Sequence, residues 1–69
     1  MTMEVVTSSV IYGVDYDTAN ENLTIQFQTG KIYIYHDVSE SIHADLMASE
    51  SKGSYFNANI KNNFSFTRG

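Results

Sequence analysis

The chain has 69 residues, no cysteine and a formal net charge of −4. This length allows a single domain with a small core, and the lack of cysteine excludes disulfides and thiolate metal sites, which fits a reducing cytoplasm. The first six residues carry no basic cluster and no long apolar run, so we expect neither a signal peptide nor a membrane span. The acidic balance counts against duplex binding, although three of the four cations lie in the last eighteen residues.

The first two predicted strands flank a polar turn. The segment from Val10 to Tyr16 alternates with period two, and its even-numbered residues are expected on one face: Val10, Tyr12, Val14 and Tyr16. The run from Asp17 to Asn22 is rich in side chains that bond to nearby backbone, so we predict a hairpin turn there. The next segment alternates again and predicts a second, half-buried strand with one apolar row: Leu23, Ile25 and Phe27.

A third predicted strand covers Lys31 to His36. It follows Gly30, which is able to take the positive φ of a tight turn, and it is rich in β-branched and aromatic residues. Tyr33 and Tyr35 share one face with Lys31, and the isoleucines at 32 and 34 lie on the other. Alternation alone does not say which face meets the helices.

Two short helices are predicted to follow. Ser39 is the expected N-cap of a helix from about Glu40 to Ser49, and Ser54 is the expected cap of a second helix that ends near Lys61. The tail 64–68 alternates and is a candidate edge strand beside the N-terminal one. The predicted fold class is therefore α+β, with a three-stranded antiparallel meander, a candidate C-terminal edge strand and two short helices packed against the sheet.

The order of these segments resembles the KTSC family, small domains named for the C-terminus of some lysyl-tRNA synthetases. The resemblance runs from about Thr7 to Arg68 and rests on these motifs: Ser8-Ser9, Tyr16-Asp17, Gly30, Tyr33-Ile34-Tyr35, Asp37-Val38, Ser51-Lys52-Gly53, Tyr55-Phe56-Asn57 and Ile60-Lys61. The family commonly has proline at the position of Ser39, and tyrosine at the positions of Phe64 and Phe66. The resemblance implies a single KTSC-like domain over residues 1–69, with RNA binding as a suggested role.

Two segments are candidate binding sites, and each has a structural alternative. Tyr33 and Tyr35 project from one strand face, which suits either stacking of unpaired bases or packing into the core. Ser51-Lys52-Gly53 lies ahead of a helix, where it makes either an anion pocket or a corner in which Gly53 takes an unusual backbone angle. The full set of candidate binding residues is Tyr33, Tyr35, Ser51, Lys52, Gly53, Tyr55, Asn57, Lys61 and Arg68.

Catalytic and metal chemistry find little support in the sequence. His36 and His43 lie seven residues apart across a strand-to-helix break, and a metal site needs at least three converging ligands, so we expect no metal. No nucleophile motif accompanies the serines, and Asp15 and Asp17 are interpreted as a solvated strand edge. We therefore expect no catalytic residue and no cofactor.

The function predicted from the sequence is that of a non-enzymatic module that binds a macromolecule in the cytoplasm. The acidic balance favours a protein partner, as for a phage- or plasmid-type accessory protein that docks onto a host nucleic-acid-handling or defence machine. The first alternative is binding of RNA or another single-stranded nucleic acid, which the family suggests. The second is a small enzyme, which would require a buried cleft lined by polar groups. The sequence leaves the oligomeric state open.

Overall fold

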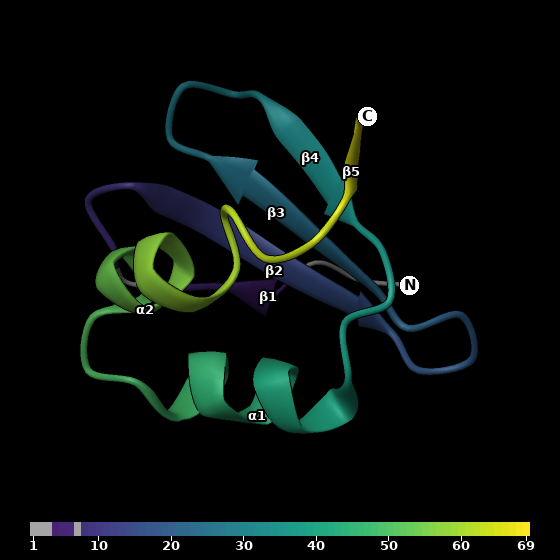
Figure 1. The fold of residues 1–69 in the computed structure, drawn as a ribbon. Coiled ribbons are helices and arrows are strands. Elements are labelled where there is room, and N and C mark those ends of the chain that lie inside the picture. Colours follow the sequence, from purple (N-terminus) through teal and green to yellow (C-terminus); the bar gives the residue numbers. More distant parts are fainter. Residues whose placement is uncertain (1–3, 7) are drawn as a thin grey trace.

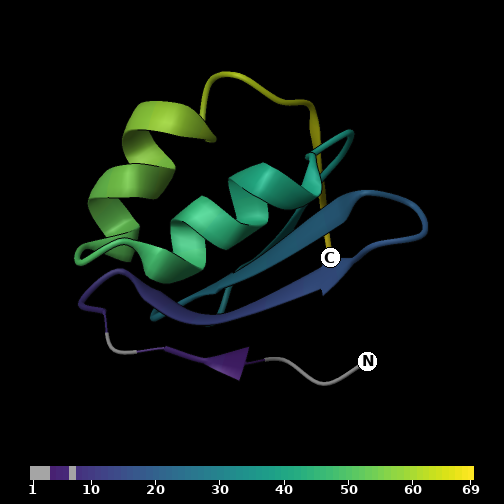
Figure 2. The ribbon, with the colours of Figure 1, turned by 90° about the horizontal axis from the view of Figure 1, so that it is seen from below.

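Five antiparallel strands form one sheet, and both helices cover the same face of it (Figures 1 and 2). The computed structural model describes residues 4–6 and 8–69. The sheet order follows the chain, and the elements are β1 (Glu4–Val5), β2 (Ile11–Asp17), β3 (Asn22–Phe27), β4 (Ile32–Tyr35), α1 (Glu40–Ala48), α2 (Lys52–Asn59) and β5 (Phe66–Arg68). The α+β class predicted from the sequence is confirmed.

The sheet has more strands than the predicted meander, which corresponds to β2, β3 and β4. The candidate tail strand forms as β5, but it pairs with β4, with Phe66 opposite Tyr35, and not beside the N-terminal strand as predicted. The strand at the other edge, β1, pairs with β2 and was not predicted. Two residues are too few to show a periodic pattern, so β1 left no signal in the sequence.

The predicted alternation of β2 is wrong because the strand contains a β-bulge. Its register with β3 shifts between Ile11 and Gly13. A bulge adds one residue to a strand and so changes which residues face the core. Ile11 and Val14 are consequently both buried, whereas Tyr12 is 43 % exposed and Val10 is also exposed.

The core lies between the sheet and the two helices. It contains two residues of the predicted row of β3, whose third member, Phe27, is only partly buried. The buried residues come from β2, β3, β4, the helices and the segments beside the helices: Ile11, Val14, Leu23, Ile25, Tyr35, Val38, Leu46, Phe56 and Ile60. Tyr35 and Phe56 are each 2 % exposed, and their ring centroids lie 5.4 Å apart in an edge-to-face pair. The face of β4 that carries Tyr33 and Tyr35 therefore meets the helices. The alternation in the sequence had not decided which face does so.

The first helix begins where the sequence predicts, and the second does not. Ser39 precedes α1, although its hydroxyl bonds to the Ser41 hydroxyl at 3.0 Å rather than to a helix N–H. The N-cap of α2 is Ser51, not Ser54, and its Oγ accepts a 3.4 Å bond from the Ser54 N–H. The predicted unusual angle at Gly53 is also wrong. Gly53 is helical and buried, and a Cβ there would lie 3.3 Å from Val10 Cβ, so it allows α2 to approach the start of β2.

Two turns confirm what the sequence predicts for them. Gly30, between β3 and β4, has a φ of 94°, the positive value expected there. Between β2 and β3, the Asp17 carboxylate accepts a 2.8 Å bond from the Asn20 side chain and a 3.1 Å bond from the Ala19 N–H. The bond from the Asn20 side chain is the main reason that the pKa of Asp17 is lowered from its ordinary value.

Replacing Asp17 by asparagine is expected to make stability less dependent on pH. Because the pKa of Asp17 is lowered by folding, its carboxylate stabilises the protein above its ordinary pKa, and this stabilisation is lost as the pH falls through the lowered native value. The melting temperature of Asp17→Asn should therefore lie below that of the wild type at about pH 7, and the two should converge towards about pH 2. Thermal melts followed by circular dichroism measure this, and a difference that stays constant over this range would contradict it.

Candidate functional site

A hollow of about 480 Å³ opens where α2 passes the β3–β4 hairpin. We call it the aromatic groove. Its floor consists of Phe27, Tyr33, Tyr35 and Phe56, and its rim carries Gln28, Lys31, Asn57 and Lys61. Four parts of the chain thus supply the site: the segment before β2, the end of β3 with its turn, β4, and α2 with the residues that follow it.

The floor of the aromatic groove is a set of rings in contact with one another. The Phe27 ring meets the rings of Tyr33 and Phe56 edge to face, with centroids 5.4 Å apart in both pairs. Tyr35 is almost fully buried, and this burial raises the pKa of its phenol. Tyr33 is only half-buried. Both tyrosines therefore line the groove, but they differ in burial: Tyr35 packs in the core, as one of the two interpretations predicted, and Tyr33 is the more accessible ring.

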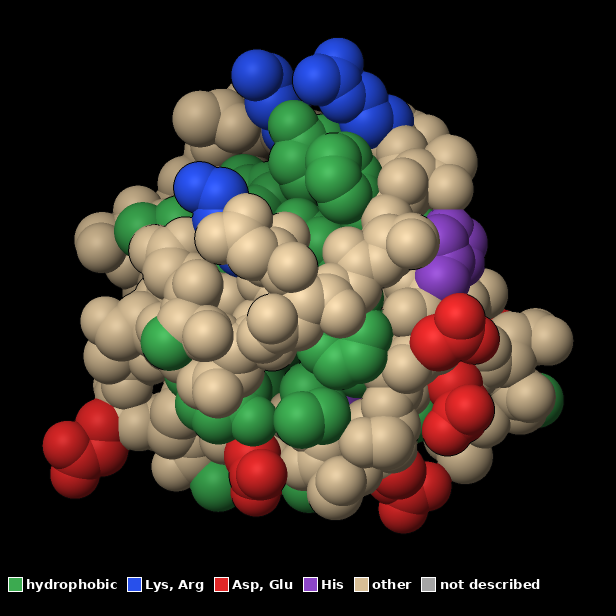
Figure 3. Space-filling model, viewed as in Figure 1, with side chains coloured by type: hydrophobic (Ala, Val, Ile, Leu, Met, Phe, Trp, Pro, Cys, Tyr) green, Lys and Arg blue, Asp and Glu red, His purple; other side chains and the backbone are tan. Residues whose placement is uncertain are grey.

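Positive charge surrounds Tyr33. Lys31 and Lys61 line the aromatic groove, and the Arg68 guanidinium carbon lies 5.7 Å from the centroid of the Tyr33 ring. The other aromatic neighbour is Phe66, which is 49 % exposed and stacks on Tyr33 with centroids 5.1 Å apart. On the surface drawn in Figure 3, the cations lie in the upper half around an apolar area, and the carboxylates lie in the lower half. Three of the four cations of the chain therefore gather at one site.

The structure does not bring all the predicted site residues together. Ser51, Lys52 and Gly53 line a separate hollow of about 450 Å³ at the start of α2, and Asn57 borders both hollows. The Ser51 hydroxyl caps α2, and the Lys52 ammonium donates a 3.3 Å bond to the Ser49 carbonyl. These contacts hold the corner between α1 and α2, although Gly53 does not take the unusual angle that the corner interpretation included.

Tyr55 lies outside both hollows. It is half-buried against the core, and its pKa is raised first by burial and then by the Asp45 carboxylate of α1. Its position is therefore towards α1 rather than towards the aromatic groove.

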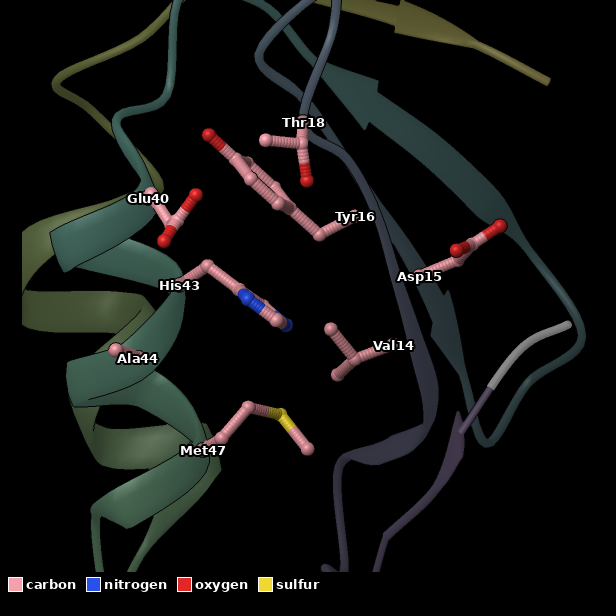
Figure 4. Close-up of a pocket in the computed structure, with 8 residues that line it drawn as sticks. All are labelled: Val14, Asp15, Tyr16, Thr18, Glu40, His43, Ala44 and Met47. Atoms are coloured by element: carbon pink, nitrogen blue, oxygen red, sulfur yellow. The ribbon is translucent and has the colours of Figure 1, made fainter. Parts of the chain in front are cut away.

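A further cleft of about 640 Å³ separates β2 from α1 (Figure 4). The Tyr16 and His43 rings stack there, with centroids 4.7 Å apart, and the Tyr16 hydroxyl donates a 2.6 Å bond to the Val38 carbonyl. Burial raises the pKa of Tyr16, and the nearby carboxylates raise it further. Glu40 lies at the cleft, whereas Asp15 points away from it in Figure 4. The Tyr16–His43 stack therefore packs α1 against β2.

Residues 4–6 and 8–69 hold no group of three or more His, Asp or Glu side chains placed to bind a metal ion. Within the same residues, no helix has the length and apolar character needed to cross a membrane.

Sequence reasoning missed several residues of the aromatic groove. Lys31 had a usable signal, because it precedes Tyr33 and Tyr35 on the same face of one strand. Gln28 and Phe56 had none, because they reach the groove through packing between segments that are distant in the chain. Lys52 was predicted as a binding residue together with Lys61 and Arg68. In the structure, Lys52 lies in the hollow at the start of α2, and Lys31 is the lysine that lines the aromatic groove together with Lys61.

The fold and the groove together define a small α+β domain with an aromatic, cation-rimmed hollow on the helix-covered side of its sheet. The chain belongs to the KTSC family, because the sequence model of the KTSC domain matches residues 7–64. This confirms the resemblance seen in the motifs.

Known relatives agree with this assignment. The crystal structure of a KTSC domain protein from Yersinia pestis superposes with a TM-score of 0.96 at 35 % identity, and the match covers 99 % of this chain and 96 % of that one. A protein from Tsukamurella paurometabola is 37 % identical over 90 % of this chain and 92 % of its own length. A lysine–tRNA ligase from Nostoc punctiforme is 41 % identical over 84 % of this chain, a match that covers 10 % of the ligase.

Proposed function

We propose that the aromatic groove binds single-stranded RNA. One observation carries this proposal: two lysines line an aromatic-floored hollow, and an arginine lies over the ring of its half-buried Tyr33. Unpaired bases stack on aromatic rings, and the phosphates beside them attract lysine and arginine. Lys31 and Lys61 on the rim suit the phosphates on either side of a base that lies against Tyr33.

The acidic net charge is compatible with this role because the charges are segregated. The carboxylates that raise the pKa of Tyr16 belong to Glu21, Glu40 and Asp17. None of these lines the aromatic groove. An RNA strand near this protein is therefore attracted to one side and repelled from the other.

The relatives support RNA rather than DNA as the ligand. Lysine–tRNA ligases are named for a tRNA substrate, and the matching segment makes up 10 % of the Nostoc punctiforme enzyme. We therefore propose that RNA is also the ligand of the present chain.

A protein partner is the second candidate, and the acidic side of the molecule favours it. A basic surface, such as that of a host nucleic-acid-handling or defence machine, is complementary to the carboxylates around Tyr16. This candidate places the interface at the β2–α1 cleft rather than at the aromatic groove.

Fluorescence anisotropy with labelled single-stranded RNA and DNA pools, at low and at physiological salt, tests the proposal. RNA should bind, with an affinity that falls as salt rises. Tyr33→Leu keeps apolar volume at the floor but removes the ring, and it should weaken binding by about tenfold, within the range for loss of one base stack. The matched control is Tyr12→Leu, since Tyr12 is an exposed strand tyrosine outside the groove.

Absence of binding at low salt, where attraction of phosphates is strongest, would reject the proposal. Equal losses in the two leucine variants would reject the aromatic groove as the binding site. Tighter binding of DNA than of RNA would reject the choice of RNA.

A further inference from the structure

The amide of Gln28 is held in a fixed orientation on the rim of the aromatic groove. Its Nε2 donates to the Ser8 carbonyl at 3.0 Å and to the Ile11 carbonyl at 3.4 Å. Carbonyl oxygens accept but do not donate, so the nitrogen must be the atom that faces them. The backbone is fixed as well, because the Gln28 N–H donates to the Val10 carbonyl at 2.9 Å.

This arrangement leaves Gln28 as a hydrogen-bond acceptor. Both hydrogens of Nε2 are used by backbone carbonyls, and Oε1 has no hydrogen-bond partner within residues 4–6 and 8–69. Gln28 lines the groove next to Phe27 and Val10, which are apolar. The groove therefore combines an aromatic floor with one oriented acceptor at its rim.

We propose that Gln28 Oε1 selects a base with an exocyclic amino group, so that the groove prefers cytosine to uracil. This inference rests on the proposed RNA-binding function. The two pyrimidines have nearly the same size and stacking surface, but C4 carries an amino group in cytosine and a carbonyl in uracil. The amino group donates to Oε1, whereas a carbonyl in the same place brings two acceptors together. Selection by one such contact is expected to be about tenfold.

The experiment compares the dissociation constants of two labelled RNA oligomers of equal length, one of cytosine and one of uracil. The wild-type protein should bind the cytosine oligomer about tenfold more tightly. A third oligomer, in which hydrogen replaces the 4-amino group of cytosine, should lose most of this advantage. This arm changes only the ligand, so it does not depend on whether any variant folds.

A protein variant assigns the contact to Gln28. Gln28→Met keeps the length of the side chain but removes the acceptor, and it should bind the cytosine and uracil oligomers equally. Thermal melts of the variant show whether the loss of the bonds to Ser8 and Ile11 has unfolded it. An unfolded variant leaves the comparison of the three oligomers on the wild type to decide the preference.

The outcomes distinguish failure of this inference from failure of the proposed RNA-binding function. Equal binding of all three oligomers by the wild type overturns the base preference and leaves RNA binding in place. A preference for cytosine that persists in a folded Gln28→Met variant overturns the role of Gln28. Failure of every oligomer to bind at low salt overturns the proposed function, and the inference with it.

Discussion

Replacing Phe56 by alanine is expected to lower the free energy of unfolding by about 3–5 kcal/mol, the usual cost of removing a buried phenylalanine side chain. Phe56 is 2 % exposed, and its ring contacts Phe27 and Tyr35 edge to face, so truncation opens a cavity between α2 and the sheet. A domain of this size has a total stability of about 3–10 kcal/mol. The variant should therefore be marginally folded or unfolded.

Urea denaturation followed by circular dichroism measures this loss, with Tyr12→Ala as the control. Tyr12 is also an aromatic residue, but it is 43 % exposed. Its truncation should change the stability by about 0.5 kcal/mol or less, as is usual at exposed sites. Similar losses in the two variants would mean that Phe56 is not at the centre of the core.

Reversing the charge of Lys61 is expected to weaken RNA binding by about tenfold at low salt, because the change removes one phosphate contact and adds repulsion. Lys61 lines the aromatic groove together with Lys31. Lys61→Glu combined with Lys31→Glu should weaken binding by about 100-fold, if the two contacts contribute independently.

The matched control for Lys61→Glu is Lys52→Glu, which changes the net charge of the protein by the same amount. Lys52 lies in the hollow at the start of α2, so its reversal should change affinity by less than about threefold, the effect of overall charge alone. Titrations by fluorescence anisotropy compare the variants. If Lys52→Glu lost as much affinity as Lys61→Glu, the interaction would be a non-specific response to net charge or would lie at the other hollow.

The sequence predicted the local structure well where one pattern ran unbroken. The row of Leu23 and Ile25 specified the buried face of β3, and Ser39 followed by Glu40 specified the start of α1. The pattern failed in β2, because the bulge at Tyr12 leaves no mark in the composition of the strand. It also failed at the start of α2, where Ser51 and Ser54 are equally suitable caps and tertiary packing decides between them.

The candidate site was only partly predictable for a related reason. Tyr33 and Tyr35 were recognised as a pair on one strand face, but spacing does not separate a core position from a surface position. That separation depends on where α2 lies, because Phe56 packs edge to face on Tyr35, whereas Tyr33 stays partly exposed. The position of α2 is a property of the packed core and not of any one segment.

The most direct test of the RNA-binding groove is a titration of the ¹⁵N-labelled protein with a single-stranded cytosine oligomer, followed by nuclear magnetic resonance. If RNA binds in the aromatic groove, chemical-shift changes should concentrate at Lys31, Tyr33, Lys61 and Arg68. The amides of Tyr16 and His43, which line the β2–α1 cleft, should stay unchanged. Shifts confined to the β2–α1 cleft, or no shifts at saturating oligomer and low salt, would contradict this proposal.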